Sequence, residues 1–295
     1  MSRHTTFRIG GPADGFIEAT TADDLHDIVV AARHHQVRYF ILGGGSNVLV
    51  SDAGIRELVI LNKAREIKFR TLNVNCESGV ILPTLARECI ERGLAGLEWA
   101  IGVPGTVGGA VVGNAGAHGS DVAQSLVSAT ILDADGSVRA WPAQDLRFEY
   151  RSSVLKAQAP SLRAGASVSD LRSPIAQPVV LAAEFELELS TREECEARAA
   201  EFTEKRRRTQ PPGATLGSMF KNPLGDYAGR LIEAAGLKGT RAGNAEISSL
   251  HANFIVNLGG ASALDVYSLI NLAHGKVKAM FGVELELEIQ LVGEW

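Results

Sequence analysis

The chain has 295 residues, of which 45% are hydrophobic and 21% are charged, and its formal net charge at pH 7 is −5. This composition is typical of a folded protein with about two domains, and it excludes a disordered chain. The acidic balance argues against a nucleic-acid binder. No apolar stretch reaches the length of a membrane span and the N-terminus has no signal-like core, so we expect a cytoplasmic enzyme or ligand-binding protein without membrane insertion.

The three cysteines, Cys76, Cys89 and Cys195, are far apart in the sequence and form no CxxC pair. This spacing argues against a disulfide framework and against a structural zinc site, and it fits a reducing compartment. No set of His, Asp or Glu residues has the spacing of metal ligands either. We therefore predict no metal site.

The N-terminal half predicts short strands that alternate with helices. Thr21 precedes two acidic residues and an apolar pattern of helical period, so it is a typical N-cap for a helix that continues past Ala32. An apolar run at 37–42 predicts a buried strand. Further strands are predicted at 58–61 and 72–76, a helix beginning near Pro83, and a hairpin turning at 133–136.

The C-terminal half continues in the same way. Residues 157–178 are rich in Ala, Ser, Pro and Arg without a clear period, which indicates a mobile surface loop. Strands are predicted at 179–189, 254–257 and 283–292, and helices at 191–208, 227–235 and 264–281. The basic run Lys205–Arg208 is best interpreted as a solvated helix end rather than a binding patch. The pattern predicts the α+β class without the regular βαβ rhythm of one parallel sheet.

Two glycine-rich segments stand out, Gly43–Asn47 directly after a strand and 102–119 (GVPGTVGGAVVGNAGAHG). Glycine loses much backbone entropy on folding, so a dense run indicates a close approach to the backbone. Consecutive backbone N–H groups in such turns can hold phosphate oxygens. Neither segment matches the G-x-G-x-x-G fingerprint, and the chain has no P-loop. Tight turns in a β-rich domain are the alternative interpretation.

These segments and several others together resemble a known family. The similar stretches are HTTFRIGGPAD (4–14), LGGGSN (42–47), the 102–119 segment, RFEYRSSVL (147–155), GSMFKNPLGDYAGRLIEAAGLKG (217–239), HANFIVN (251–257) and LELEIQLVG (285–293). In this order they resemble the UDP-N-acetylenolpyruvoylglucosamine reductases, the MurB family of peptidoglycan synthesis. The resemblance covers essentially the whole chain.

The resemblance implies a fold and a domain division. The fold is the two-subdomain FAD-binding fold of the vanillyl-alcohol-oxidase/PCMH type, followed by a C-terminal α+β substrate domain. We expect the FAD-binding domain at 1–190, with its two subdomains divided near 55–65, and the substrate domain at 191–295. A monomer or weak oligomer is expected.

The resemblance also implies a cofactor and a reaction. NADPH would reduce non-covalently bound FAD, and flavin N5 would then pass hydride to UDP-N-acetylglucosamine enolpyruvate, giving UDP-N-acetylmuramate. The predicted FAD-binding residues are Gly43, Gly44, Gly45, Ser46, Asn47, Gly105, Thr106, Gly108, Gly109, Asn114, Gly116 and Ala117. His118 stands where the family commonly has Tyr.

Three residues match the family's catalytic positions. Ser218 would donate the proton, Arg151 would bind the enolpyruvyl carboxylate, and Glu288 would lie beside the enol intermediate. Taken alone, each is compatible with an ordinary structural role: a turn serine, a surface arginine beside an aromatic residue, and a glutamate on the solvated face of an alternating strand. Glu286 points to the same side of that strand as Glu288 and is interpreted as structural.

Three further residues are assigned to the substrate. Lys221 and Asn222, in the same motif as Ser218, are expected to shape the substrate site, and Tyr150 to line its channel.

Two other functions are compatible with parts of the pattern. A related PCMH-type flavin oxidase would pass electrons to oxygen, and a non-catalytic protein would bind flavin or a nucleotide sugar without turnover. Ser218, Arg151 and Glu288 together favour the reductase.

Overall fold

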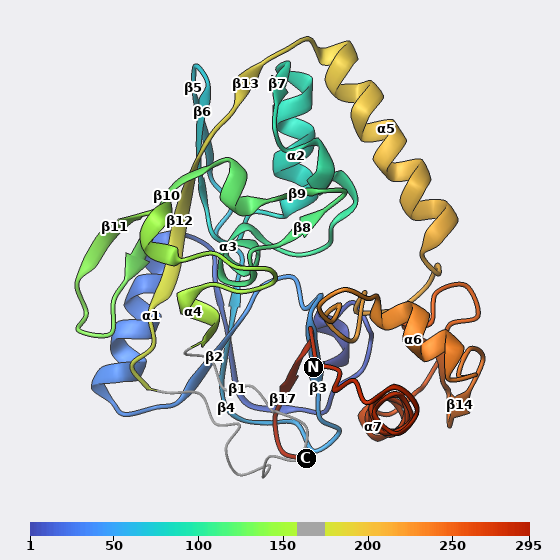
Figure 1. Ribbon diagram of the computed structural model, residues 1–295. Coiled ribbons are helices and arrows are strands. Elements are labelled where there is room, and N and C mark those ends of the chain that lie inside the picture. Colours follow the sequence, from blue (N-terminus) through green and yellow to red (C-terminus); the bar gives the residue numbers. More distant parts are fainter. Residues whose placement is uncertain (158–174) are drawn as a thin grey trace.

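The computed structural model describes residues 1–157 and 175–295 (Figure 1). The predicted α+β class is confirmed: small sheets and helices alternate along the chain. The predicted loop at 157–178 falls mainly on residues 158–174, which lie outside the described residues.

The first sheet is small and parallel. Its strands, in the spatial order β1-β4-β2, are β1 (Ala13–Ala19), β4 (Ile55–Asn62) and β2 (Tyr39–Leu42). The helix α1 (Ala22–His34) connects β1 to β2, which both run parallel to the central strand β4; strands that run in the same direction need such a crossover. Its predicted cap is confirmed, because the Thr21 side chain accepts a hydrogen bond from Asp24 N and the Asp24 carboxylate accepts one from Thr21 N. The chain leaves β2 directly into the Gly43–Asn47 turn.

The second sheet is antiparallel and carries the other glycine-rich segment. Its strands, in spatial order, are β11 (Val138–Pro142), β10 (Leu126–Leu132), β12 (Val179–Glu186), β6 (Asn73–Glu77) and β5 (Ile67–Arg70). The helices α2 (Leu82–Glu91) and α3 (Val107–Gly113) share its hydrophobic core. The predicted hairpin at 133–136 is confirmed as the β10–β11 connection.

A third unit is built from C-terminal residues. It contains α6 (Ala228–Ala234), α7 (Ala263–Phe281) and the antiparallel strands β14 (Arg241–Ala242), β15 (Ala245–Ile247) and β16 (Ile255–Asn257). Phe7 and Leu49 are buried in its core, so the N-terminal segment packs with residues more than 200 positions away. The strand β17 (Gln290–Val292) pairs in parallel with β3 (Val48–Val50), and both termini lie in this region of Figure 1.

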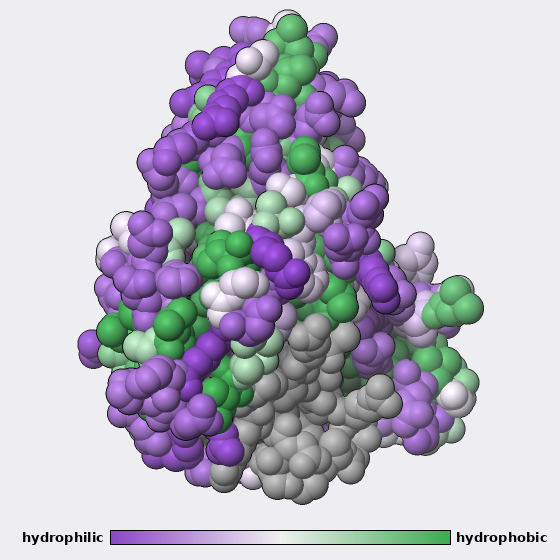
Figure 2. Space-filling model, turned by 90° about the vertical axis from the view of Figure 1, so that its left-hand side faces the viewer, coloured by the Kyte–Doolittle hydropathy of each residue, from purple (hydrophilic) through white to green (hydrophobic). Residues whose placement is uncertain are grey.

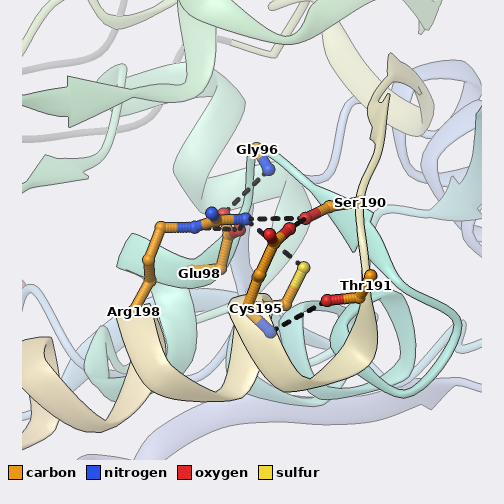
Figure 3. Close-up of polar contacts among 7 residues, drawn as sticks. Gly96, Glu98, Ser190, Thr191, Cys195 and Arg198 are labelled. Carbon is orange, nitrogen blue, oxygen red and sulfur yellow. Dashed lines mark hydrogen bonds and ion pairs between the residues drawn. The ribbon is translucent and has the colours of Figure 1, made fainter.

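The helix α5 (Arg192–Thr209) runs along the right-hand side of Figure 1 from the second sheet's unit to the C-terminal unit. Arg198 fixes it to the segment before the second glycine loop, because both its Nε and a terminal nitrogen donate to Glu98 Oε1 at 2.9 and 2.6 Å. Glu98 Oε2 accepts from Gly96 N at 2.8 Å (Figure 3). The side chain of Glu98 is only 7% exposed. This ion pair therefore sets where α5 lies relative to the glycine loop.

The remaining elements are short. They are η1 (Ser2–His4), β7 (Leu94–Ala95), η2 (Glu98–Gly102), β8 (Gly116–Ala117), β9 (Ser120–Asp121), η3 (Val122–Gln124), η4 (Ala143–Leu146), α4 (Val154–Ala157) and β13 (Glu188–Leu189). The surface turned to the viewer in Figure 2 is mostly hydrophilic, with hydrophobic residues in small groups. Among the described helices, none combines the length and apolar character that crossing a lipid bilayer requires.

Two predicted strands differ from the structure. The strand expected at 283–292 is regular only in β17, because the preceding residues make one isolated bridge, between Leu287 and Phe220, before the chain joins β3. The strand expected at 179–189 is divided at Leu187 into β12, which pairs with β10 and β6, and β13, which pairs with β7. Alternation of apolar residues persists in both cases, which is why the sequence suggested continuous strands.

Candidate active site

One large cleft lies between the second sheet's unit and the C-terminal unit, with a volume of about 2060 Å³. Parts of five segments that are distant in the sequence line it: 43–48, 102–118, 149–156, 209–224 and 284–291. Every site residue predicted from the sequence lines this cleft except Asn114. Asn114 is buried instead, where its Nδ2 donates to Glu149 O at 3.1 Å and its Oδ1 accepts from Ala123 N at 3.1 Å.

The two glycine segments touch each other along one wall of the cleft. A Cβ added at Gly43 would overlap Thr106 Oγ1, and one added at Gly44 would lie 3.0 Å from Gly105 Cα. Gly45 has a φ of +60° and faces the backbone of His4. These glycines are therefore required by contacts within the protein itself.

Other glycines leave open space on the cleft side. A Cβ at Gly113 would meet no atom within 4 Å, and one at Gly109 would meet only Thr106 Oγ1, at 3.7 Å. Within the described part of the chain, the backbone N–H groups of Gly44, Gly45 and Ser46 have no hydrogen-bond acceptor. Such consecutive free N–H groups are a binding site for phosphate oxygens, so this wall fits the diphosphate of a dinucleotide cofactor.

Arg151 and Glu288 meet in the cleft as an ion pair, with 2.8 Å between Arg151 Nε and Glu288 Oε1. Arg151 has a φ of +56°, and the two backbone hydrogen bonds between Glu149 and Ser152 close a tight turn around it. No acceptor for the two terminal nitrogens of Arg151 is found among the described residues. Burial raises the pKa of Glu288 above its ordinary value although the Arg151 charge opposes this shift.

Two lysines surround this pair. Lys221 Nζ lies 2.6 Å from Glu286 Oε1, so the exposed Glu286 serves as its partner. Lys156 Nζ donates to Arg151 O at 2.9 Å and lines the cleft. Burial lowers the pKa of Lys156, and the Lys221 charge lowers it further. Lys156 was not predicted from the sequence; its position directly after the RFEYRSSVL stretch, five residues from Arg151, was the one available signal.

Ser218 lies on the strand-like segment that faces Glu288. The backbone N–H of Glu288 donates to Met219 O at 2.9 Å, and Ser218 forms an isolated bridge with Phe254. Asn253, also missed in the sequence analysis, fixes this segment: its Oδ1 accepts from Phe220 N at 3.0 Å and its Nδ2 donates to Phe220 O at 2.8 Å. Ser218 and Glu288 thus come from adjacent stretches of backbone.

The other two substrate candidates, Asn222 and Tyr150, line the same cleft. The amide oxygen of Asn222 accepts from Ala228 N at 3.1 Å, at the start of α6. Tyr150 is 53% exposed, and its ring centroid is 5.3 Å from the guanidinium carbon of Arg151. His118 stacks on Phe202 with 4.6 Å between ring centroids. No group of three or more His, Cys, Asp or Glu placed to hold a metal is found in residues 1–157 and 175–295.

Comparisons with known proteins cover the whole chain. A family model described as "FAD binding domain" matches residues 13–140, and one described as "UDP-N-acetylenolpyruvoylglucosamine reductase, C-terminal domain" matches 209–292. The chain is 42% identical to the UDP-N-acetylenolpyruvoylglucosamine reductase of Chloroflexus aggregans, over 99% of this chain and 95% of the relative. It is 43% identical to that of Rubrobacter xylanophilus, over 100% of this chain and 94% of the relative.

A solved structure agrees with these relatives. The crystal structure of UDP-N-acetylenolpyruvylglucosamine reductase (MurB) from Thermus caldophilus matches with a TM-score of 0.79 and 35% identity, over 99% of this chain and 96% of that one. The resemblance seen in the glycine segments and in the motifs around Arg151, Ser218 and Glu288 therefore extends through sequence and fold alike, and the chain belongs to the UDP-N-acetylenolpyruvoylglucosamine reductase (MurB) family.

Proposed function

We propose that this protein uses NADPH to reduce UDP-N-acetylglucosamine enolpyruvate to UDP-N-acetylmuramate in peptidoglycan synthesis. Gly43–Asn47 and the open side of the 105–117 loop would hold FAD without a covalent bond. When bound, FAD supplies the hydride transfer, which amino-acid side chains cannot perform. The observation that carries the proposal is the Arg151–Glu288 ion pair in the cleft, beside the backbone stretch of Ser218.

Arg151 is suited to bind the enolpyruvyl carboxylate. Its Nε is occupied by Glu288, which fixes the plane of the guanidinium group. The two terminal nitrogens remain for a planar carboxylate, whose oxygens they match as a pair. Because the guanidinium is charged at every relevant pH, it would also stabilise negative charge that develops on the carboxylate during reduction.

Ser218 would protonate the carbon next to the carboxylate. A serine hydroxyl is a weak acid, so the site must stabilise the oxygen that loses its proton. Lys156 and Lys221 both lower the pKa of Glu288 through their charges, so they place positive charge in this part of the cleft. Glu288 would lie beside the enol intermediate, opposite Ser218. Tyr150, Lys221 and Asn222 would contact the rest of the substrate.

The experiment follows the flavin absorbance band of the purified protein in anaerobic stopped flow. NADPH should bleach the band, and the enolpyruvyl substrate should restore it. Ser218→Ala should leave bleaching intact and slow the recovery by roughly 10² to 10⁴, the usual contribution of a positioned proton donor. Ser268→Ala is the matched control, because this serine is exposed on α7 and outside the cleft. Equal loss of both half-reactions in Ser218→Ala would exclude the proton-donor role.

The domain division remains part of the proposal. The separate ranges of the two family models support an FAD-binding domain at 1–190 followed by a substrate domain at 191–295, and a division of the first near 55–65 is proposed as well. The packing of Phe7 and Leu49 in the C-terminal core adds that the N-terminal segment serves both units. A monomer or weak oligomer is proposed, and light scattering of the FAD-loaded protein would test it.

A further inference from the structure

Arg151 lies in a turn whose conformation needs outside support. Glu149 and Ser152 exchange two backbone hydrogen bonds of 3.1 Å, and Arg151 lies between them with a φ of +56°. A residue that carries a Cβ rarely adopts this left-handed conformation, and it persists only where the surrounding structure fixes it. The contacts around the turn therefore show how the protein places Arg151 in the cleft.

The second glycine segment fixes both ends of this turn. Asn114 follows directly after α3, and its Nδ2 donates to Glu149 O at 3.1 Å. On the other side of Arg151, Ser153 Oγ donates to Val112 O, within α3, at 2.6 Å. Asn114 and Ser153 are both buried. These two bonds attach the turn to the loop that is proposed to hold FAD, but neither involves Arg151 itself.

Lys156 fixes Arg151 itself. It extends from the single turn of α4, whose Leu155 is buried in the core of the second sheet's unit, and its Nζ donates to Arg151 O at 2.9 Å. Burial lowers the pKa of Lys156, yet no carboxylate among residues 1–157 and 175–295 lies within ion-pair distance of its Nζ. An ammonium group that loses water without gaining such a partner is costly, so stability alone does not explain this lysine.

We propose that Lys156 is a positioning residue for the reductase reaction, which holds the backbone of Arg151 so that the guanidinium group faces the enolpyruvyl carboxylate. The inference rests on the proposed function, in which Arg151 binds that carboxylate. Glu288 holds the guanidinium end of the arginine through Nε, at 2.8 Å, and Lys156 holds its backbone end. A long side chain that is fixed at both ends loses less conformational freedom when it binds a ligand. The planar guanidinium fork also needs this alignment to bind a carboxylate through two nitrogens.

The first test uses two ligands that differ only in the enolpyruvyl group, UDP-N-acetylglucosamine enolpyruvate and UDP-N-acetylglucosamine. Neither reacts with oxidised holoenzyme when NADPH is absent, so calorimetry gives both dissociation constants. Lys156→Met keeps a chain of similar length and removes the donor. It should weaken binding of the enolpyruvate about tenfold, the lower end of what a charged hydrogen bond contributes, and change binding of UDP-N-acetylglucosamine less than about twofold. Equal weakening of both ligands would overturn the proposal.

The second test is a double-variant cycle that separates positioning from direct contact, since Lys156 also lines the cleft. If Lys156 acts through Arg151, Lys156→Met should weaken enolpyruvate binding about tenfold in the wild-type background and hardly at all in Arg151→Met. Additive losses would mean that Lys156 touches the substrate itself, and they would overturn the positioning role. Lys156→Arg, which keeps a charged donor, should recover part of the affinity.

The matched control is Lys68→Met, because Lys68 is exposed on β5, outside the cleft, and pairs with Glu66 at 2.6 Å. It should leave both dissociation constants unchanged. The flavin band of each FAD-loaded variant shows that it is folded. If the wild-type holoenzyme bound neither ligand, the proposed function itself would fail. Tight binding of the enolpyruvate that Lys156→Met leaves unchanged would overturn only the role of Lys156.

Discussion

Thr106 occupies the space that a side chain at Gly43 would need, because a Cβ added there would overlap Thr106 Oγ1. The next atoms of Thr106, Cβ and Cγ2, would each be 3.4 Å away. This contact joins the turn after β2 to the loop before α3. The absence of a side chain at Gly43 therefore allows these two segments to pack against each other. Their contact forms the wall of the cleft that is proposed to hold the cofactor.

We predict that Gly43→Ala destabilises the protein through this single overlap. Overpacking of this kind costs about 1–3 kcal/mol in unfolding free energy. Urea denaturation of the apoprotein measures the loss. Thr106→Ala removes the overlapping atom, so the double variant should regain most of the stability lost in Gly43→Ala. Strictly additive losses in the double variant would show that the overlap is not the cause.

The opposite outcome is expected at Gly113, the last residue of α3, where an added Cβ meets no atom within 4 Å. Gly113→Ala should leave the apoprotein as stable as before or more stable by about 0.5 kcal/mol, since alanine is favoured over glycine in helices. FAD affinity should nevertheless fall, because the new methyl group enters the cleft. Titration of apoprotein with FAD measures this. Unchanged affinity would show that FAD does not approach Gly113.

Elements with local signals were predictable from the sequence. The Thr21 cap, the helix beginning near Pro83 and the hairpin at 133–136 all depend on residues within a few positions of each other. The glycine segments also pointed to the cleft, because a run so dense in glycine is costly in entropy unless the backbone must be approached closely. The family motifs then placed Arg151, Ser218 and Glu288 on its walls.

Contacts between distant residues were not predictable in the same way. Nothing near Phe7 indicates that it joins the C-terminal core, and nothing near Asn253 indicates that its side chain bonds to the backbone of Phe220. Arg206 illustrates the limit most clearly. It shares its sequence neighbourhood with two exposed arginines, yet its own side chain is half-buried against Gly102, so the basic run is not a solvated helix end throughout.

Glu288 should give the protein a measurable pH dependence. Burial raises its pKa in the folded state above the ordinary carboxyl value that holds in the unfolded state. Between these two values the folded state binds more protons, so rising pH reduces stability there. Glu288→Gln removes this effect. The unfolding free energy of the variant minus that of the wild type should therefore increase with pH across this window in urea titrations.

Glu284 provides the control for that slope. Its hydrogen bond from Lys278 holds the pKa of Glu284 below the ordinary value, so its contribution to stability is gained as pH rises. Glu284→Gln should give a small difference that decreases with pH, opposite to Glu288→Gln. A Glu288→Gln difference that stays flat or decreases would mean that the buried carboxylate is fully compensated by Arg151 and the two lysines.

The Arg198–Glu98 pair gives the last prediction. Burial opposes ionisation of Glu98, but hydrogen bonds from Gly96, its own backbone and Arg198 hold its pKa below the ordinary value. Arg198→Met removes the charged partner and leaves a buried carboxylate, which should cost about 2 kcal/mol of unfolding free energy at neutral pH. This cost should shrink as the pH falls, because Arg198 stabilises only the ionised carboxylate of Glu98 and protonation removes that charge.

Arg192→Met is the matched control for this variant. Arg192 lies on the same helix, is exposed, and pairs with the exposed Glu196 at 2.7 Å. Such surface pairs contribute less than about 1 kcal/mol. If Arg198→Met cost no more than Arg192→Met at neutral pH, the ion pair would not be what fixes α5 beside the glycine loop. In that case Phe202 and the buried face around Cys195 and Ala199 would have to hold the helix alone.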